Sequence, residues 1–259
     1  MTNFNLLTYE KRGPLALITL NRPKALNALN LELFAELRQA LIEAQMDDEV
    51  QIPIITGAGR AFCAGADLKS VADHHASERA RWVGAYEYAE AADALYRQMT
   101  QMGKIVMTMV NGLAHAGGIV LAACSDISVA SENATFRVPE GLVGIADELS
   151  TTWLEASIGL ARTKLLILTA QEFSAAEVRD MGLIAKVVPQ DQLWSAVEEM
   201  ARMVLQTGPR ARSVFKQLLN DRLPKTQQRH IVESHLNAES REGAEAFSQK
   251  RKPNWVPRA

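Results

Sequence analysis

The sequence predicts an α/β fold built from repeated ββα units. Short apolar runs typical of buried strands recur at residues 15–20, 52–55, 105–110 and 127–130. The spacing of strand, strand and helix along the chain favours ββα repeats over a simple βαβ alternation. No Gly-x-Gly-x-x-Gly motif follows a strand, which argues against a doubly wound dinucleotide-binding fold.

The amino-terminal quarter predicts two strands, a helix and a third strand. The two strands cover residues 6–9 and 15–20, and the third covers 52–55. Asn30 is a favourable cap for a helix over 31–46, because its side chain can accept a hydrogen bond from a free amide of the first turn. The expected apolar stripe of this helix consists of Leu31, Phe34, Leu37, Leu41 and Ile42.

A long helical pattern over residues 77–102 precedes the next strands, which we expect at 105–110, 127–130 and 135–138. Its acidic residues Glu87, Glu90 and Asp93 are interpreted as a solvated face. The inward positions that we expect for this helix are Trp82, Tyr86, Ala89, Leu95 and Met99.

Beyond Asp147 the chain is mostly helical, and no Gly- or Ser-rich linker divides it. A length of 259 residues with 47% hydrophobic content suits one substantial domain with a helical appendage. We place a core at residues 1–195 and a C-terminal helical segment at 196–259. The helices are expected at 148–157, 162–169, 175–181, 192–205, 211–220 and 225–242.

Composition excludes several classes of function. A net charge of -2 gives no excess of positive charge of the kind that binds a nucleic acid. The chain has no apolar run of membrane-spanning length and no Cys/His cluster at metal-ligand spacing, so we expect neither a membrane partner nor a metal. Cys63 and Cys124 lie in apolar or alanine-rich surroundings, as small core residues do, which suits a reducing cytoplasm.

One stretch predicts a site for negative charge. The apolar run 105–110 turns through Gly112, Gly117 and Gly118 into an alanine-rich helical run. A strand that turns into a helix leaves free N–H groups and a positive dipole end at one spot. Such a spot binds an anion, or a charge that develops only in a transition state; the alternative is an ordinary tight turn.

Five stretches, taken in order, resemble motifs of the crotonase (enoyl-CoA hydratase/isomerase) superfamily: Asn21–Leu29, Ala61–Lys69, Asn111–Ala122, Phe136–Gly144 and Glu242–Pro253. The resemblance runs nearly end to end. It implies a crotonase-type spiral of ββα repeats with a C-terminal helical trimerisation region, assembled as a homotrimer or homohexamer. It also implies an acyl-CoA thioester as substrate, with coenzyme A as part of that substrate and no separate cofactor.

The resemblance also assigns backbone roles. It makes the amides of Ala66 and Gly117 the two donors of an oxyanion hole. Phe247 and Lys250 would reach the coenzyme from a neighbouring subunit, and Lys24 would lie near its phosphates. The alternative is that Lys24 and Lys250 are ordinary surface lysines. The full set of implied coenzyme A contacts is Lys24, Ala25, Leu26, Ala64, Gly65, Asp67, Leu68, Phe247 and Lys250.

The candidate catalytic carboxylates depart from the hydratase pattern. Val120 stands where family hydratases carry their first glutamate, while Glu140 matches the second. Asp147 resembles the acid/base aspartate of related isomerases, and helix capping is its alternative role. Because double-bond migration needs one mobile base whereas addition of water uses two carboxylates, we expect isomerase-type proton shuttling over hydration.

His115 is the third candidate catalytic group, two residues before Gly117. It could activate water in a hydrolase or a carbon–carbon bond-cleaving enzyme, or it could be structural. The family's dehalogenases use a histidine base where this chain has residues 88–93, which include no histidine. Hydration remains an alternative, and a catalytically weak acyl-CoA-binding scaffold is the alternative of another class.

Overall fold

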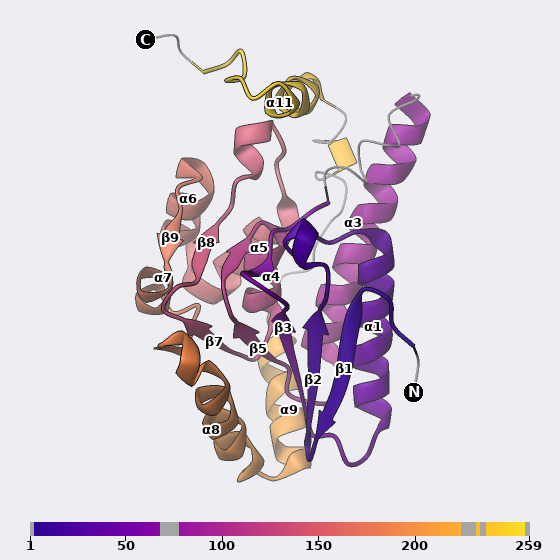
Figure 1. Cartoon of the computed structure of the whole chain (residues 1–259), viewed down its shortest axis with the longest axis vertical. Helices are drawn as coiled ribbons and strands as arrows, with labels where there is room; N and C mark the ends of the chain where they lie inside the picture. Colours follow the sequence, from indigo (N-terminus) through magenta and orange to yellow (C-terminus); the bar gives the residue numbers. More distant parts are fainter. Residues whose placement is uncertain (1–2, 68–77, 224–231, 234–236, 257–259) are drawn as a thin grey trace.

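The computed structural model describes residues 3–67, 78–223, 232–233 and 237–256 as two β-sheets surrounded by helices (Figure 1). The implied coenzyme A contact Leu68 and most of the helix expected over 225–242 lie outside these residues. No helix within the described ranges is both long and apolar enough to cross a membrane.

The larger sheet has six strands in the order β1-β2-β3-β5-β7-β10, and the smaller has four in the order β4-β6-β8-β9. Neighbours in both sheets are parallel, except that β1 pairs antiparallel with β2 and β9 antiparallel with β8. The larger sheet comprises β1 (Leu7–Arg12), β2 (Leu15–Leu20), β3 (Ile52–Gly57), β5 (Met107–Val110), β7 (Ile127–Ser131) and β10 (Lys186–Val188). The smaller comprises β4 (Ala61–Cys63), β6 (Leu113–His115), β8 (Thr135–Arg137) and β9 (Phe173–Ser174).

Three successive ββα units build the spiral, and each unit gives one strand to each sheet. The units are β3-β4-α3, β5-β6-α4 and β7-β8-α5, with α3 at Glu78–Gln101, α4 at Gly117–Cys124 and α5 at Glu148–Ile158. The predicted ββα repeat is thereby confirmed. The short strands β4 and β6 are not among the predicted strands, because three residues inside glycine-rich turns carry no readable alternation.

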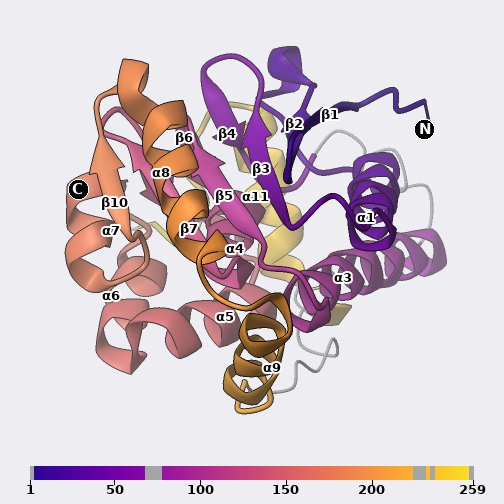
Figure 2. The ribbon, with the colours of Figure 1, turned by 90° about the horizontal axis from the view of Figure 1, so that it is seen from below.

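Two apolar cores flank the larger sheet. The main core includes α1 (Leu31–Met46), α3, α4 and α5, with Phe34, Phe62 and Phe136 fully enclosed. The second core packs α8 (Leu193–Leu205) against the sheet, and α8 crosses the strands in Figure 2. The predicted boundary between residues 195 and 196 falls inside α8, so packing extends the core at least to the end of this helix.

The capping role of Asn30 is confirmed, because its side chain accepts a 2.9 Å hydrogen bond from Leu33 N–H. The predicted stripe of α1 is wrong at both ends: Leu31 and Ile42 are exposed, whereas Leu33 and Ala40 are buried. The apolar face is rotated toward α3, which packs along α1.

The predicted faces of α3 also need correction. Trp82 and Tyr86 are exposed and stack on each other with ring centroids 5.4 Å apart, while Ala89, Leu95 and Met99 face the core as expected. Asp93 is not solvated. Its side chain is 1% exposed and forms a 2.7 Å ion pair with Arg97.

The helix α9 (Pro209–Asn220) buries polar side chains and exposes apolar ones, which is the reverse of an ordinary surface helix. Its polar Arg212 and Lys216 are buried, whereas Phe215, Leu218 and Leu219 are 57–65% exposed. It lies beside α3 (Figure 2). The remaining described helices are η1 (Pro23–Ala25), η2 (Glu140–Val143), α6 (Leu160–Thr169), α7 (Ala175–Met181), η3 (Gln190–Gln192) and α11 (Ala238–Ser248).

Candidate active site

The candidate site lies where β3 and β5 end, since the chain leaves these parallel neighbours through the two glycine-containing stretches. Two asparagines hold the first stretch in place. Asn27 donates to the carbonyls of Ala58 and Ala61 at 3.0 and 2.8 Å. Asn111 accepts the Gly57 N–H at 3.0 Å. Both side chains therefore fix the turn between β3 and β4.

The two predicted oxyanion loops touch each other through Gly65. A Cβ atom at Gly65 would collide with the Ala116 side chain and would lie 3.1 Å from the Gly117 nitrogen. Only glycine permits this contact, and its φ of +87° also favours glycine. Within the described chain, neither the Ala66 nor the Gly117 N–H donates a hydrogen bond to another residue. The structure thus brings together two loops whose amides are available to a bound molecule.

The turn at Ala116 is strained, with φ 50° and ψ -125° directly before α4. Strained non-glycine conformations of this kind collect at functional sites. The Ala116 N–H bonds to the Arg137 carbonyl at 2.9 Å, and Gly118 sits so close to Cys63 that any side chain would overlap it. The amino end of α4 is therefore held rigidly against β4 and β8.

The predicted coenzyme A segments also run side by side. Ala64 N–H donates to the Leu26 carbonyl at 3.0 Å, and Leu29 N–H donates to the Gly65 carbonyl at 2.7 Å. Lys24 is exposed, and Ala25 and Leu26 are partly buried. Asp67 pairs with Arg22 at 2.7 Å, so its carboxylate ties the two segments together.

Glu140 begins the short helix η2 that follows β8. The residue is partly exposed, but its Oε2 atom is closed off from solvent and has no hydrogen-bond partner in the described chain. Burial raises the pKa of Glu140 to about 8, and the nearby negative charge of Asp147 adds to the shift. A carboxyl group with this pKa can bind and release a proton near neutral pH.

Asp147 is the N-cap of α5. Its carboxylate accepts the N–H groups of Leu149 and Ser150 at 2.9 and 3.2 Å and also the Ser150 hydroxyl. The capping alternative is thereby confirmed. Asp147 still lies near enough to Glu140 to raise its pKa, so the two predicted carboxylates are brought together.

Val120 is fully buried in α4 and belongs to the main core. Tyr96 comes close to the same helix from α3: a Cβ atom at Gly117 would lie 3.1 Å from its hydroxyl. Tyr88 packs edge-on against Phe34, and burial raises the pKa of both tyrosines well above the usual value. Both phenols therefore stay neutral.

The structure places His115 in a different group. Its Nε2 lies 3.2 Å from both the Thr135 hydroxyl and the Glu172 carboxylate. Burial lowers the pKa of His115, and Glu172 opposes this shift. No hydrogen bond or ion pair between described residues joins His115 to Glu140 or Asp147.

Phe247 is 65% exposed on α11, and Lys250 is exposed just after this helix. Their implied partner site is on a neighbouring subunit, so they remain predictions. Among the described residues, no group of three His, Cys, Asp or Glu side chains could hold a metal ion.

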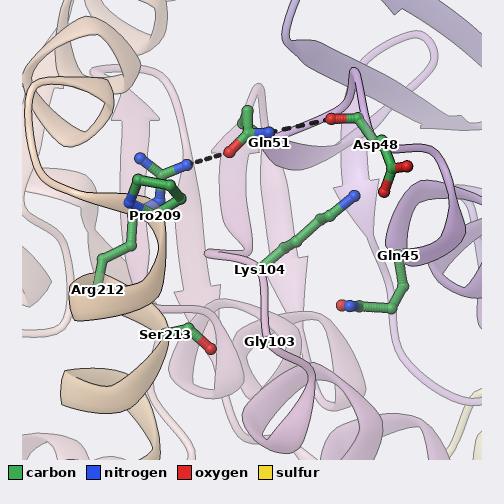
Figure 3. A pocket seen from close by; sticks show the side chains of 8 residues that line it. All are labelled: Gln45, Asp48, Gln51, Gly103, Lys104, Pro209, Arg212 and Ser213. Atoms are coloured by element: carbon green, nitrogen blue, oxygen red, sulfur yellow. Dashed lines mark hydrogen bonds between the residues drawn. The ribbon is translucent and has the colours of Figure 1, made fainter.

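A hollow of about 250 Å³ lies elsewhere, beside the residues that precede β3 and β5 (Figure 3). That position is at the opposite edge of the sheet from the candidate site. Its two cations have structural partners: Lys104 donates to the Ala44 and Asp47 carbonyls at 2.7 Å, and Arg212 donates to Gln51 and the Thr207 carbonyl. We therefore place no chemistry there.

Three residues that organise the site were missed as site residues from sequence: Arg22, Asn27 and Asn111. All three stand inside the motifs quoted above, and the Asn111-Gly112 dipeptide is a turn signal. Their role was hidden because each also binds a partner that lies 30 or more residues away along the chain.

Comparison with known proteins gives consistent matches. A family model described as enoyl-CoA hydratase/isomerase matches residues 10–258. The short-chain-enoyl-CoA hydratase of Clostridium acetobutylicum is 35% identical over 83% of this chain and 81% of its own length. The crotonyl-CoA hydratase of Syntrophomonas wolfei is 33% identical over 95% and 96%.

Solved structures agree with this result. An enoyl-CoA hydratase from Mycobacterium avium has a TM-score of 0.85 and 28% identity, covering 97% of this chain and 99% of its own. A methylmalonyl-CoA decarboxylase also has a TM-score of 0.85, covering 99% and 100%, and at 22% identity it shows the shared fold alone.

Proposed function

The chain belongs to the enoyl-CoA hydratase/isomerase family of acyl-CoA-processing enzymes, and we propose that within it the protein moves a double bond by a proton shuttle on Glu140. One observation carries this proposal: the Oε2 atom of Glu140 is enclosed and has no partner within the described chain. A buried carboxylate that is not used to hold the fold is typical of an acid/base catalyst.

In this proposal the amides of Ala66 and Gly117 form the oxyanion hole. Contact of the two loops at Gly65 supports the assignment, as do the two N–H groups without an acceptor among described residues. Both would donate to the thioester oxygen as it gains negative charge. Loss of one such donor typically reduces the rate by about 10²–10³.

The shuttle needs only one carboxylate. Ionised Glu140 removes a proton from the carbon beside the thioester carbonyl of a 3-enoyl-CoA, and the C–H electron pair forms a dienolate. The charge passes to the oxygen held by the two amides. The Glu140 acid then returns the proton to the γ-carbon, and the product is the conjugated 2-enoyl-CoA. Atoms and charge balance without a further reactant.

Hydration is the second candidate, because several relatives carry that name. It needs a further acid/base group beside Glu140. Val120 cannot hold a proton, and the Asp147 carboxylate accepts hydrogen bonds from Leu149 and Ser150. These contacts favour isomerisation. Asp147 would act mainly by capping α5 and by raising the pKa of Glu140.

The other two alternatives are weaker. A hydrolase or carbon–carbon bond-cleaving enzyme would use His115, whose ring contacts Thr135 and Glu172 and which we assign a structural role. A binding scaffold without catalysis would give no reason for an enclosed carboxylate to remain at Glu140. Binding of an acyl-CoA without turnover would favour the scaffold.

We also propose that the predicted residues bind coenzyme A and that the protein is a homotrimer or homohexamer. A neighbouring copy would contribute Phe247 and Lys250 to each site. The exposed Phe215, Leu218 and Leu219 on α9 support burial against another copy, since contiguous exposed apolar faces mark interfaces. Free, buried Cys63 and Cys124 suit a cytoplasmic location.

Absorbance of the conjugated thioester tests the reaction. We expect it to rise when the protein receives a 3-enoyl-CoA and to change little with crotonyl-CoA, which hydration would consume. Rapid loss of the crotonyl-CoA signal would mean that Glu140 and Asp147 together add water, and the isomerase proposal would fail.

A further inference from the structure

The turn that carries Glu140 is not held by its own side chains. None of the η2 residues is buried, and Leu142 is 46% exposed. Main-chain hydrogen bonds fold the turn: Ile145 N–H donates to the Glu140 carbonyl at 3.0 Å, Leu142 N–H to the Pro139 carbonyl at 2.9 Å and Gly144 N–H to the Gly141 carbonyl at 3.3 Å. Because Oε2 of Glu140 has no partner in the described chain, the side chain depends on its backbone for position.

The C-terminal helix α11 supplies the missing support. It packs on η2 and lies across the top of the molecule in Figure 1. A Cβ atom at Gly243 would lie 2.6 Å from the Cα atom of Val143, closer than real Cβ atoms approach. A Cβ atom at Gly144 would lie 2.5 Å from the carbonyl carbon of Glu239. The helix therefore rests on the turn backbone to backbone.

The contact explains a glycine that helix formation disfavours. Gly243 is in the interior of α11, where glycine costs about 1 kcal/mol relative to alanine. Glu239 and Gly243 are four residues apart and so share one face of the helix. Gly243 and Ala246 are buried on α11, while Phe247 is exposed.

We infer that Gly243 is a positioning residue, which acts by seating α11 on the Val143–Gly144 backbone and so fixes Glu140 for proton transfer. The inference rests on the proposed function of Glu140. The same helix carries Phe247, so the element predicted to reach the coenzyme A of a neighbouring copy also braces the turn of Glu140 in its own chain.

Gly243→Ala tests the inference, and the readouts are the turnover rate and the Michaelis constant for isomerisation of a 3-enoyl-CoA. The new methyl group must lift α11 or shift Val143, and small displacements of a catalytic group reduce rates by up to about 10². We expect kcat to fall about 10- to 100-fold in a protein that remains folded. The pH at which the rate is half-maximal should move below that of the wild type, because solvent reaches Glu140.

Gly141→Ala is the matched control. Gly141 lies in the same turn, next to Glu140, and an added Cβ atom would meet nothing within 4 Å. We expect kcat to stay within about twofold of the wild type, because the added methyl group displaces no neighbour. An equal loss in both variants would contradict the role of α11.

The double variant Glu140→Gln with Gly243→Ala separates positioning from general damage. If Gly243 acts through Glu140, its change has little effect on the residual rate of Glu140→Gln. If Gly243→Ala lowers the residual rate of Glu140→Gln by the same factor as it lowers the wild-type rate, the inference is overturned. A fully active Glu140→Gln overturns the proposed function and this inference with it, whereas an inactive Glu140→Gln beside a normal Gly243→Ala overturns the inference alone. If the alanine variant aggregates, Gly144→Ala tests the same contact from the side of the turn, because its Cβ atom would meet Glu239 of α11.

Discussion

Asp126 and Glu140 are both enclosed carboxylates, but their surroundings are opposite. Asp126 Oδ2 accepts from the Lys216 ammonium and from Val106 N–H, each at 2.7 Å. Glu140 Oε2 has no partner within the described chain, and its charged neighbour Asp147 is negative. Burial raises the pKa of both groups, while Lys216 opposes the shift only at Asp126.

The difference separates a structural carboxylate from the one that we propose as catalytic. Lys216 also donates to the carbonyls of Met99 and Lys104 at 2.6 and 2.9 Å, so the Asp126 site links α9 to α3 and to the segment before β5. Removal of one partner of a buried pair destabilises a protein strongly. An unpartnered buried carboxylate instead lowers stability by its presence, which is consistent with a role in chemistry.

Glu140→Gln should give the largest effect on activity. The change keeps the shape of the side chain and removes the ionisable group, so we expect kcat to fall by about 10²–10⁴. Stability should be unchanged near pH 5 and higher than the wild type above pH 8, because the wild type loses stability as pH rises through the raised pKa. Turnover and thermal midpoints at both pH values check this.

Glu132→Gln is the control for this variant. Glu132 is exposed, on the turn before the same strand β8. A comparable loss of rate in the control would show that the effect is not specific to the enclosed carboxylate.

Lys216→Met should give the largest effect on stability, about 3–5 kcal/mol, because it leaves Asp126 buried without its cation. Denaturant unfolding would measure the loss. The variant should become relatively more stable as pH falls, since protonation removes the unpaired charge. Addition of Asp126→Asn should restore part of the lost stability.

Lys164→Met provides the reference for Lys216→Met. Lys164 is exposed on α6, and we expect a change within about 0.5 kcal/mol. If Lys216→Met proves equally mild, the Asp126 pair does not hold α9 in place and the contrast with Glu140 loses its basis.

The pH dependence of the wild type sharpens the comparison further. Only ionised Glu140 can remove a proton, and its pKa is raised to about 8. We therefore expect kcat/KM to rise with pH and to level off above about pH 8. If kcat/KM is already constant from pH 6 upward, the catalytic base is a carboxylate with an ordinary pKa, and the enclosed Glu140 is not that base.

Asp147→Asn should have the smallest effect. Asn caps helices about as well as Asp, so stability should change by about 1 kcal/mol or less. Loss of the negative charge should move the rise of kcat/KM to lower pH, because that charge contributes to the raised pKa of Glu140. A fall of about 10² in the plateau rate, with a normal thermal midpoint, would give Asp147 a direct part in proton transfer.

Local pattern predicted much of the fold. The strand at 15–20, the Asn30 cap and the helix at 175–181 follow from neighbouring residues alone, and the structure confirms them. The glycine turns likewise indicated the loops at Gly65 and Gly117. Their contact could not be read from the sequence, because it joins positions about 50 residues apart.

Tertiary packing explains the errors. Asp93 reads as one more acid on a solvated face, but the fold buries its side chain, although its ion-pair partner Arg97 lies only four residues away on the same helix. Burial of Lys216 was equally out of reach of local pattern, because its partners Met99, Lys104 and Asp126 lie about 90 or more residues away along the chain. The outward Trp82 and Tyr86 show the converse, since an apolar residue on a helix does not reveal which side the core lies on.

Hydrogen exchange into substrate carbon tests the central claim most directly. A 3-enoyl-CoA is incubated in heavy water with the wild type and with Glu140→Gln, and mass spectrometry locates the label. Transfer by one carboxyl group predicts a 2-enoyl-CoA whose γ-hydrogen comes from the α-carbon, with deuterium at the α- or γ-carbon only in turnovers in which the Glu140 acid exchanges with solvent before it returns the proton. Glu140→Gln should give neither transfer nor label, and no product should gain water. Exchange that persists in Glu140→Gln, or a main product that carries added water, would contradict a single proton carrier at Glu140.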